Sequence, residues 1–122
     1  MMCVPFALSF VSGATPEEVL ALLQEDGGYG RRKRTFPRSG YIPALKKLGV
    51  SVLATNHSPH VTVQTWVRDV AGPASTWIIR VSGHLMVSQG GKIFDNMDPT
   101  GSGASLKAMA RCRVTHAWKV AA

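Results

Sequence analysis

The chain has 122 residues, of which 45% are hydrophobic, enough for one domain with its own core and too few for two. No apolar run approaches the roughly 18 residues of a membrane span, and the N-terminal stretch lacks the basic start and cleavage site of a signal peptide. We therefore expect a single domain over residues 1–122, without a membrane span and located in the cytoplasm. The two cysteines are too few for a disulfide framework or a four-cysteine zinc site.

The N-terminal segment from Cys3 to Val11 is apolar at most positions and has a proline near its start, a pattern typical of a helix buried on most sides. Cys3 would then lie at the helix N-terminus, where unpaired N–H groups and the positive end of the helix dipole stabilise a thiolate. The same N–H groups, that of Val4 included, can receive an oxyanion. Cys3 is therefore a candidate nucleophile, and a cysteine that lies near the chain start by chance is the alternative.

Two further helices are predicted before the sheet. Thr15 is an N-cap followed by a proline and two acids, which predicts a helix that runs to about Glu25 and stops at Gly27-Gly28. A third helix is predicted from Tyr41 or Ile42 through Leu48. We interpret both as packing elements.

A basic loop is expected between these two helices, within a chain whose formal net charge is +7. Its basic residues are Arg31, Arg32, Lys33, Arg34 and Arg38. Glycines and prolines interrupt the run, so it does not form one helical face. A solvated loop is the simplest interpretation, and a weak binding site for an acidic partner is the alternative. Nucleic acid ranks last among such partners, because few aromatic side chains accompany the basic ones.

The middle of the chain changes from helical to extended patterns. Val50–Ala54 is predicted as a short strand or an extended connection, and Val61–Val70 as a strand or a short helix, with a helix favoured from Val63. His57 and His60 lie in the loop between these segments. The spacing places no third ligand near them, so we expect neither a metal nor a cofactor.

The most informative stretch runs from Trp77 to Asn96. Residues that favour strands stand on both sides of Gly90-Gly91, which predicts a strand, a tight turn and another strand. His84 opens one strand and Asp95 closes the next, so an antiparallel hairpin can bring their side chains together. An imidazole held by a carboxylate is half of a nucleophilic site, and Cys3 is the candidate for the other half.

The C-terminal part is predicted to hold a short helix from Ala104 to Ala110 and a last strand from Cys112 to Val120. Cys112 is expected to be a small core residue, and His116 a weak second histidine candidate. The order of elements predicts an α+β fold with N-terminal helices packed on a small antiparallel sheet.

Several short motifs, spread over nearly the whole chain, resemble those of the papain-like cysteine peptidases. They are Cys3-Val4-Pro5, Thr15-Pro16-Glu17-Glu18, Gly40-Tyr41-Ile42-Pro43, Gly83-His84 and Gly91-Lys92-Ile93-Phe94-Asp95. Within that fold the chain is most similar to the bacteriocin-leader-processing peptidases and to small, often phage-encoded, proteins like them. A phage-encoded protein would act in the host cytoplasm.

The resemblance implies a cysteine hydrolase that cleaves a peptide or isopeptide bond in a peptide or protein substrate. It implies that Cys3 is the nucleophile, His84 the general base and Asp95 the acid that orients the imidazole. Cell-wall cysteine peptidases also have a cysteine at a helix start and a histidine that opens a strand. They are a less favoured interpretation, because their Asp-Cys-Ser-Gly start is absent from this chain.

Two features depart from the papain-like pattern. Such peptidases usually carry a glutamine a few residues before the cysteine to complete the oxyanion hole, whereas only Met1 and Met2 precede Cys3. A chain of 122 residues also leaves little room for a deep substrate groove. The alternative function is therefore a catalytically weak or inactive papain-like module that binds an acidic partner through the basic loop.

Overall fold

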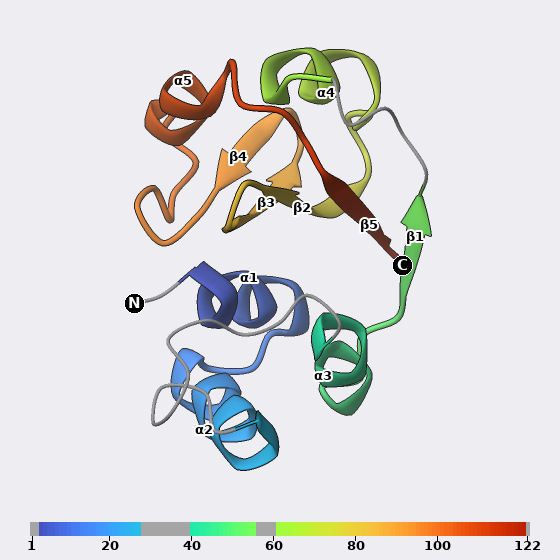
Figure 1. Ribbon diagram of the computed structural model, residues 1–122, viewed down its shortest axis with the longest axis vertical. Coiled ribbons are helices and arrows are strands. Elements are labelled where there is room, and N and C mark those ends of the chain that lie inside the picture. The colour runs from blue at the N-terminus through green and yellow to red at the C-terminus, as the bar shows by residue number, and fades with distance from the viewer. Residues whose placement is uncertain (1–2, 28–39, 56–60, 122) are drawn as a thin grey trace.

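The computed structural model, which describes residues 3–27, 40–55 and 61–121, is an antiparallel sheet with helices on both faces (Figure 1). The helices are α1 (Cys3–Ser12), α2 (Pro16–Gly27), α3 (Tyr41–Lys47), α4 (Val63–Asp69) and α5 (Ala104–Met109). The strands are β1 (Val52–Thr55), β2 (Thr76–Val81), β3 (His84–Gln89), β4 (Lys92–Phe94) and β5 (His116–Val120). Their order in the sheet is β1-β5-β2-β3-β4, and all neighbours are antiparallel.

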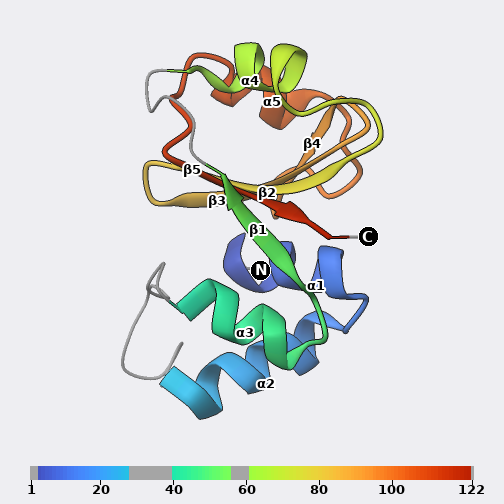
Figure 2. The same ribbon diagram turned by 90° about the vertical axis from the view of Figure 1, so that its right-hand side faces the viewer.

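The sheet separates two layers of helices, with α1, α2 and α3 on one face and α4 and α5 on the other (Figure 2). Each face is closed by its own apolar cluster. Leu8 and Leu45 pack with Ile78 on the first face, whereas Trp66 packs with Met86 on the second. The predicted α+β class, with N-terminal helices on an antiparallel sheet, is confirmed. On the second face, α5 agrees with the short helix predicted from Ala104, and α4 decides the open prediction for Val61–Val70 in favour of a helix that begins at Val63.

The N-terminal helices begin and end where the sequence signals them. α1 begins at Cys3 and buries Val4 and Leu8 toward the sheet and α2. The hydroxyl of Thr15 accepts a hydrogen bond from the N–H of Glu18 at 3.1 Å, as an N-cap does. α3 is followed by Gly49, whose φ of 81° is typical of a helix C-terminus. The three predicted helices are confirmed.

The stretch around His84 contains two tight turns. β2 turns at Ser82-Gly83 into β3, so that Val81 pairs with His84, and β3 turns at Gly90-Gly91 into β4. The φ of Gly83 is 72°, a backbone conformation that glycine adopts without steric cost. His84 therefore opens β3, where its backbone pairs with that of Val81 in β2.

The last predicted strand is shorter than expected, and the prediction for Cys112 is wrong. β5 begins only at His116, and Cys112 is exposed. The reason is that the chain still turns at Cys112, whose carbonyl accepts a hydrogen bond from the N–H of Val63 at the start of α4. Val114 is the first residue of this segment to enter the core.

Gly101 holds the loop between β4 and α5 against Phe94. Its φ is 67°, and a Cβ atom added there would lie 2.6 Å from Cε2 of Phe94. The ring has little freedom to move, because it packs on Phe10 with centroids 4.8 Å apart. We expect Gly101→Ala to lower the free energy of unfolding by about 2–4 kcal/mol, through backbone strain and overpacking together.

Gly103→Ala is the matched control for this prediction. Gly103 also has a positive φ, of 105°, but no described atom lies within 4 Å of the added Cβ. It should therefore lose only the strain contribution, about 1–2 kcal/mol. Denaturant unfolding of both variants makes the comparison, and equal losses would argue against a packing role for Gly101.

Candidate active site

Cys3, His84 and Asp95 meet at one end of the sheet, although they come from distant parts of the chain. Cys3 begins α1, His84 begins β3, and Asp95 directly follows β4. Nε2 of His84 lies 2.8 Å from Oδ2 of Asp95. The side chain of Cys3 hydrogen-bonds that of His84. The structure thus brings together all three residues that the sequence singled out for a nucleophilic site.

The two ring nitrogens of His84 have separate partners. Because Asp95 engages Nε2, Nδ1 is the nitrogen that is left for the Cys3 sulfur. A carboxylate on Nε2 fixes the proton there, so the neutral ring presents a basic Nδ1 to the thiol. The arrangement therefore allows the imidazole to take the thiol proton without turning.

The pKa of the Cys3 thiol lies below its ordinary value. Partial burial acts to raise this pKa, but the hydrogen bond with His84, the N–H of Leu85, the imidazolium charge and the N–H of Val4 together outweigh burial. The N–H of Val4, which the sequence suggested as an oxyanion donor, hydrogen-bonds the sulfur itself. The N–H of Leu85 was not foreseen, since it depends on how α1 lies against β3.

The pKa of His84 is raised to about 8. The hydrogen bond with Cys3 contributes most, partial burial opposes it, and the hydrogen bond and charge of Asp95 add to the increase. A thiol whose pKa is lowered beside an imidazole whose pKa is raised favours a thiolate–imidazolium pair. That pair is the reactive form of a cysteine nucleophile.

The carboxylate of Asp95 binds His84 through Oδ2 and accepts further hydrogen bonds at Oδ1. It is only 1% exposed. Its Oδ1 accepts hydrogen bonds from the hydroxyl of Ser105 at 2.7 Å, from the N–H of Asp98 at 2.8 Å and from the N–H of Met97 at 3.0 Å. Burial acts to raise the pKa of Asp95, but Ser105, His84 and Asp98 outweigh it, and the pKa is lowered.

A second buried carboxylate, that of Asp98, fixes the loop that carries these donors. Its Oδ1 accepts hydrogen bonds from the N–H of Ser102 at 2.9 Å and from its hydroxyl at 2.7 Å. Its Oδ2 accepts the N–H of Ser105 at 3.2 Å, and the bonds from Ser102 hold the pKa of Asp98 below its ordinary value. Sequence reasoning missed this support. The only signal in the sequence was the presence of several short polar residues, Asp95, Asp98, Ser102 and Ser105, directly after the hairpin.

Removing the hydroxyl of Ser105 should loosen Asp95. We expect Ser105→Ala to lower the free energy of unfolding by about 1.5–3 kcal/mol at neutral pH, as for a hydrogen bond to a charged group. The pKa of Asp95 is lowered in the folded state, so this stabilisation is present above its unfolded pKa and is lost as the pH falls through the folded one. Denaturant unfolding at pH 7 and at pH 3 therefore tests the prediction. Ser105→Thr, which keeps the hydroxyl, should restore most of the loss, and a Ser105→Ala protein as stable as wild type at pH 7 would contradict it.

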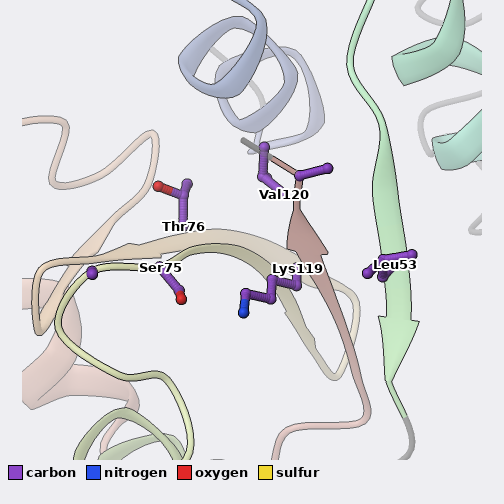
Figure 3. A pocket seen from close by; sticks show the side chains of 7 residues that line it. Leu53, Ser75, Thr76, Lys119 and Val120 are labelled. Carbon is purple, nitrogen blue, oxygen red and sulfur yellow. The ribbon is translucent and has the colours of Figure 1, made fainter.

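A shallow cavity of about 430 Å³ lies elsewhere, at the other end of β2 and β5 (Figure 3). Its lining includes Thr76 and Lys119, together with exposed Leu53 of β1. In the sheet, Trp77 pairs with Lys119, whereas Val81 at the opposite end of β2 pairs with His84. The cavity is therefore separated from Cys3 by the length of a strand.

Some sequence predictions lie outside the described residues. These are the basic loop with Arg31, Arg32, Lys33, Arg34 and Arg38, the histidines His57 and His60, and the two methionines before Cys3. Within residues 3–27, 40–55 and 61–121, no group of three His, Cys, Asp or Glu side chains is placed to hold a metal ion. Over the same ranges, no single helix has both the length and the apolar composition to cross a membrane.

Comparisons with known proteins identify no relative of this chain. No protein-family model matches the chain, and no match is found among curated proteins or solved structures. The side chains of the site are therefore the evidence for its chemistry. They comprise a thiol with a lowered pKa, an imidazole able to accept and return a proton, and a buried carboxylate that orients it.

Proposed function

We propose that the protein is a small cysteine hydrolase that cleaves a peptide or isopeptide bond. The observation that carries the proposal is the hydrogen-bonded series from the Cys3 thiol through His84 to the buried carboxylate of Asp95. The thiol stands at a helix N-terminus and the imidazole on a rigid strand, so both are positioned before a substrate arrives. A series of this kind activates a cysteine for attack on a carbonyl.

The acylation step uses Cys3 and His84 in turn. The Cys3 thiolate attacks the carbonyl carbon, and an electron pair of the C=O bond moves onto the oxygen. The tetrahedral intermediate then collapses, the C–N bond breaks, and the imidazolium of His84 donates its proton to the leaving nitrogen. The products of this step are a free amine and a thioester on Cys3.

Deacylation reverses the roles with water as the nucleophile. Neutral His84 takes a proton from water as the oxygen attacks the thioester carbon. The C–S bond breaks, a carboxylic acid leaves, and the thiolate–imidazolium pair returns. Asp95 holds the ring through both steps and stabilises the imidazolium.

The oxyanion would be received by N–H groups of the first turn of α1, at the positive end of the helix dipole. Pro5 has no N–H, and the N–H of Val4 is already shared with the sulfur. One missing donor commonly reduces the rate by about 100- to 1000-fold. We therefore expect slow turnover, or a need for a substrate that supplies a donor of its own.

We further propose the papain-like fold as the finer description of this α+β arrangement, in one domain over residues 1–122. It is supported by the placement of the nucleophile on the first helix and of His84 and Asp95 on the sheet. The motifs favour small leader-processing or phage-type peptidases as the class, with a peptide or protein substrate in the cytoplasm.

The proposal is tested by searching for new amino termini in a library of peptides with blocked N-termini, supplemented with isopeptides branched at lysine. Wild type should generate new amines and Cys3→Ser should generate none, whereas Cys112→Ser should behave as wild type. Acid-quenched wild-type protein should carry an acyl mass on the tryptic peptide of Cys3. Equal products from wild type and Cys3→Ser would overturn the hydrolase and leave the binding module as the function to pursue.

A further inference from the structure

Arg80 is a half-buried cation next to the candidate active site. It lies in β2, opposite Leu85 of β3 and His116 of β5. Its Nε is buried, and no described residue accepts a hydrogen bond from it. A buried charged donor without an acceptor is unfavourable by itself. Because this Nε is covered, a substrate would engage the outer nitrogens of the guanidinium of half-buried Arg80, and a carboxylate there would stabilise its charge.

The side chain of Arg80 is on the same face of the sheet as α1. Side chains alternate along a strand, and Ile78, two residues earlier, belongs to the cluster that packs on α1. Ile79 and Val81 belong to the cluster on the other face. Arg80 therefore points toward the layer that contains Cys3.

Only one residue separates Arg80 from the thiol. Leu85 is its direct cross-strand neighbour, and such neighbours have Cβ atoms about 4.5–5.5 Å apart. The N–H of Leu85 in turn hydrogen-bonds the Cys3 sulfur. The long arginine side chain is thus within reach of a chain bound across Cys3.

The backbone at Arg80 is fixed in advance. Its carbonyl accepts hydrogen bonds from the N–H of Thr115 at 2.8 Å and from the hydroxyl of Thr115 at 3.0 Å. The acids of the site do not neutralise it, because Asp95 is bound to His84 and Asp98 to serine donors. A positioned cation without a competing acid is suited to recognise an anion.

We propose that Arg80 binds a carboxylate of the substrate, so that the enzyme prefers a chain with an acidic residue close to the scissile bond. The inference rests on the proposed hydrolase and adds the class of its substrate. A guanidinium matches a carboxylate with two parallel hydrogen bonds, and the net charge of +7 attracts acidic chains from a distance. The carboxylate can belong to a side chain or to a chain terminus.

The test uses acetylated tripeptidyl vinyl sulfones, which modify a reactive cysteine irreversibly. Each matched pair carries Glu or Gln at one of three positions and alanine at the others, and mass spectrometry follows adducts on Cys3 and Cys112. In at least one pair the Glu form should modify wild-type Cys3 about 10- to 100-fold faster than the Gln form. Arg80→Gln should reduce this preference to below about twofold, and Arg80→Lys should keep part of it.

Arg111→Gln is the charge-matched control, since Arg111 is exposed and follows α5, a helix on the other face of the sheet (Figure 2). It should keep the full preference for the Glu form. A second arm measures protection of Cys3 from iodoacetamide by trialanine with a free carboxylate or an amide at its end. Protection by the free acid alone assigns the terminus as the ligand, and a Glu preference alone assigns the side chain.

The outcomes separate the two proposals. A reactive Cys3 without any carboxylate preference, or a preference that persists in Arg80→Gln, overturns the inference and leaves the hydrolase standing. A Cys3 that reacts no faster than Cys112 with every probe overturns both. Because no described residue accepts a hydrogen bond from the buried Nε of Arg80, Arg80→Gln should unfold at the same temperature as wild type or higher, which verifies that the variant is folded.

Discussion

His84→Ala is expected to reduce peptide hydrolysis by about 100- to 10,000-fold, the range of a lost general acid–base. In the wild type the pKa of His84 is raised to about 8, so the imidazolium is present at pH 7 to stabilise the thiolate and to protonate the leaving amine. Without it, burial acts on the pKa of Cys3 with only backbone N–H groups opposing it. Alkylation of Cys3 at neutral pH should therefore slow together with hydrolysis. Both rates are measured on the same preparations.

His116→Ala is the matched control for this variant. His116 is a second histidine at the same end of the sheet, and its ring stacks on Trp118 with centroids 5.8 Å apart. It was a weak candidate in the sequence and does not contact the thiol in the described hydrogen bonds. Hydrolysis by His116→Ala should stay within about threefold of wild type, since the hydrogen bonds and the charge that lower the pKa of Cys3 come from His84, Leu85 and Val4. Equal losses in the two variants, or none in His84→Ala, would contradict the assigned role of His84.

Asp95→Ala should be the most destabilising change at the site, by about 3–5 kcal/mol. It removes a buried carboxylate and leaves the hydroxyl of Ser105 and the N–H groups of Asp98 and Met97 without their acceptor. A domain of this size is commonly stable by only about 5–15 kcal/mol, so the loss is a large share. Denaturant unfolding measures it, and a loss below about 1 kcal/mol would contradict the description of Asp95 as a buried, fully engaged group.

Asp95→Asn separates the charge from the hydrogen bonds. The amide oxygen can still accept from Ser105 and Asp98, so the loss of stability should be smaller than for Asp95→Ala. The negative charge is gone, so the pKa of His84 should fall from about 8. NMR titration of the His84 ring detects this change. An unchanged pKa in Asp95→Asn would mean that Cys3 alone determines the protonation of His84.

The pH dependence of stability follows from the same shifts. The folded pKa of Asp95 is lowered, so its contribution is present above the unfolded pKa and is lost as the pH falls through the folded one. The folded pKa of His84 is raised from 6.5 to about 8, so its contribution is complete below the unfolded value and is lost as the pH rises through about 8. His84→Ala should flatten the alkaline side of the profile and weaken the acid side in part, because His84 contributes to the lowered pKa of Asp95.

The parts of the site that sequence could predict are those encoded by short, local signals. Cys3 was placed by an apolar run with an early proline, and His84 and Asp95 by a Gly-Gly turn between strand-forming residues. A hairpin brings residues 11 positions apart to a predictable distance, and the bond between His84 and Asp95 confirms it. The N-cap at Thr15 and the end of α3 at Gly49 are local in the same sense.

The features of the site that the sequence did not predict depend on contacts that leave no periodic pattern of residues in the sequence. The support of Asp95 by Ser105 spans an irregular loop, where neither 3.6-residue nor alternating spacing applies. Arg80 looked like one polar residue of an apolar strand, and only the sheet order shows that it lies opposite Leu85 and faces α1. The prediction for Cys112 was wrong because we extended the alternating apolar and polar pattern of the last strand back to this residue. Cys112 lies instead in a turn, where its carbonyl accepts a hydrogen bond from the N–H of Val63.

The central claim, that Cys3 and His84 form an activated pair, is tested most directly by the pH dependence of iodoacetamide labelling. Mass spectrometry resolves Cys3 from Cys112, an exposed thiol in the same molecule that serves as the internal reference. We predict that Cys3 reaches half of its maximal labelling rate at a pH below about 8.5, the ordinary value for a thiol. A Cys3 profile that follows an ordinary thiol, with its midpoint at or above that pH, would contradict the pair and the hydrolase built on it.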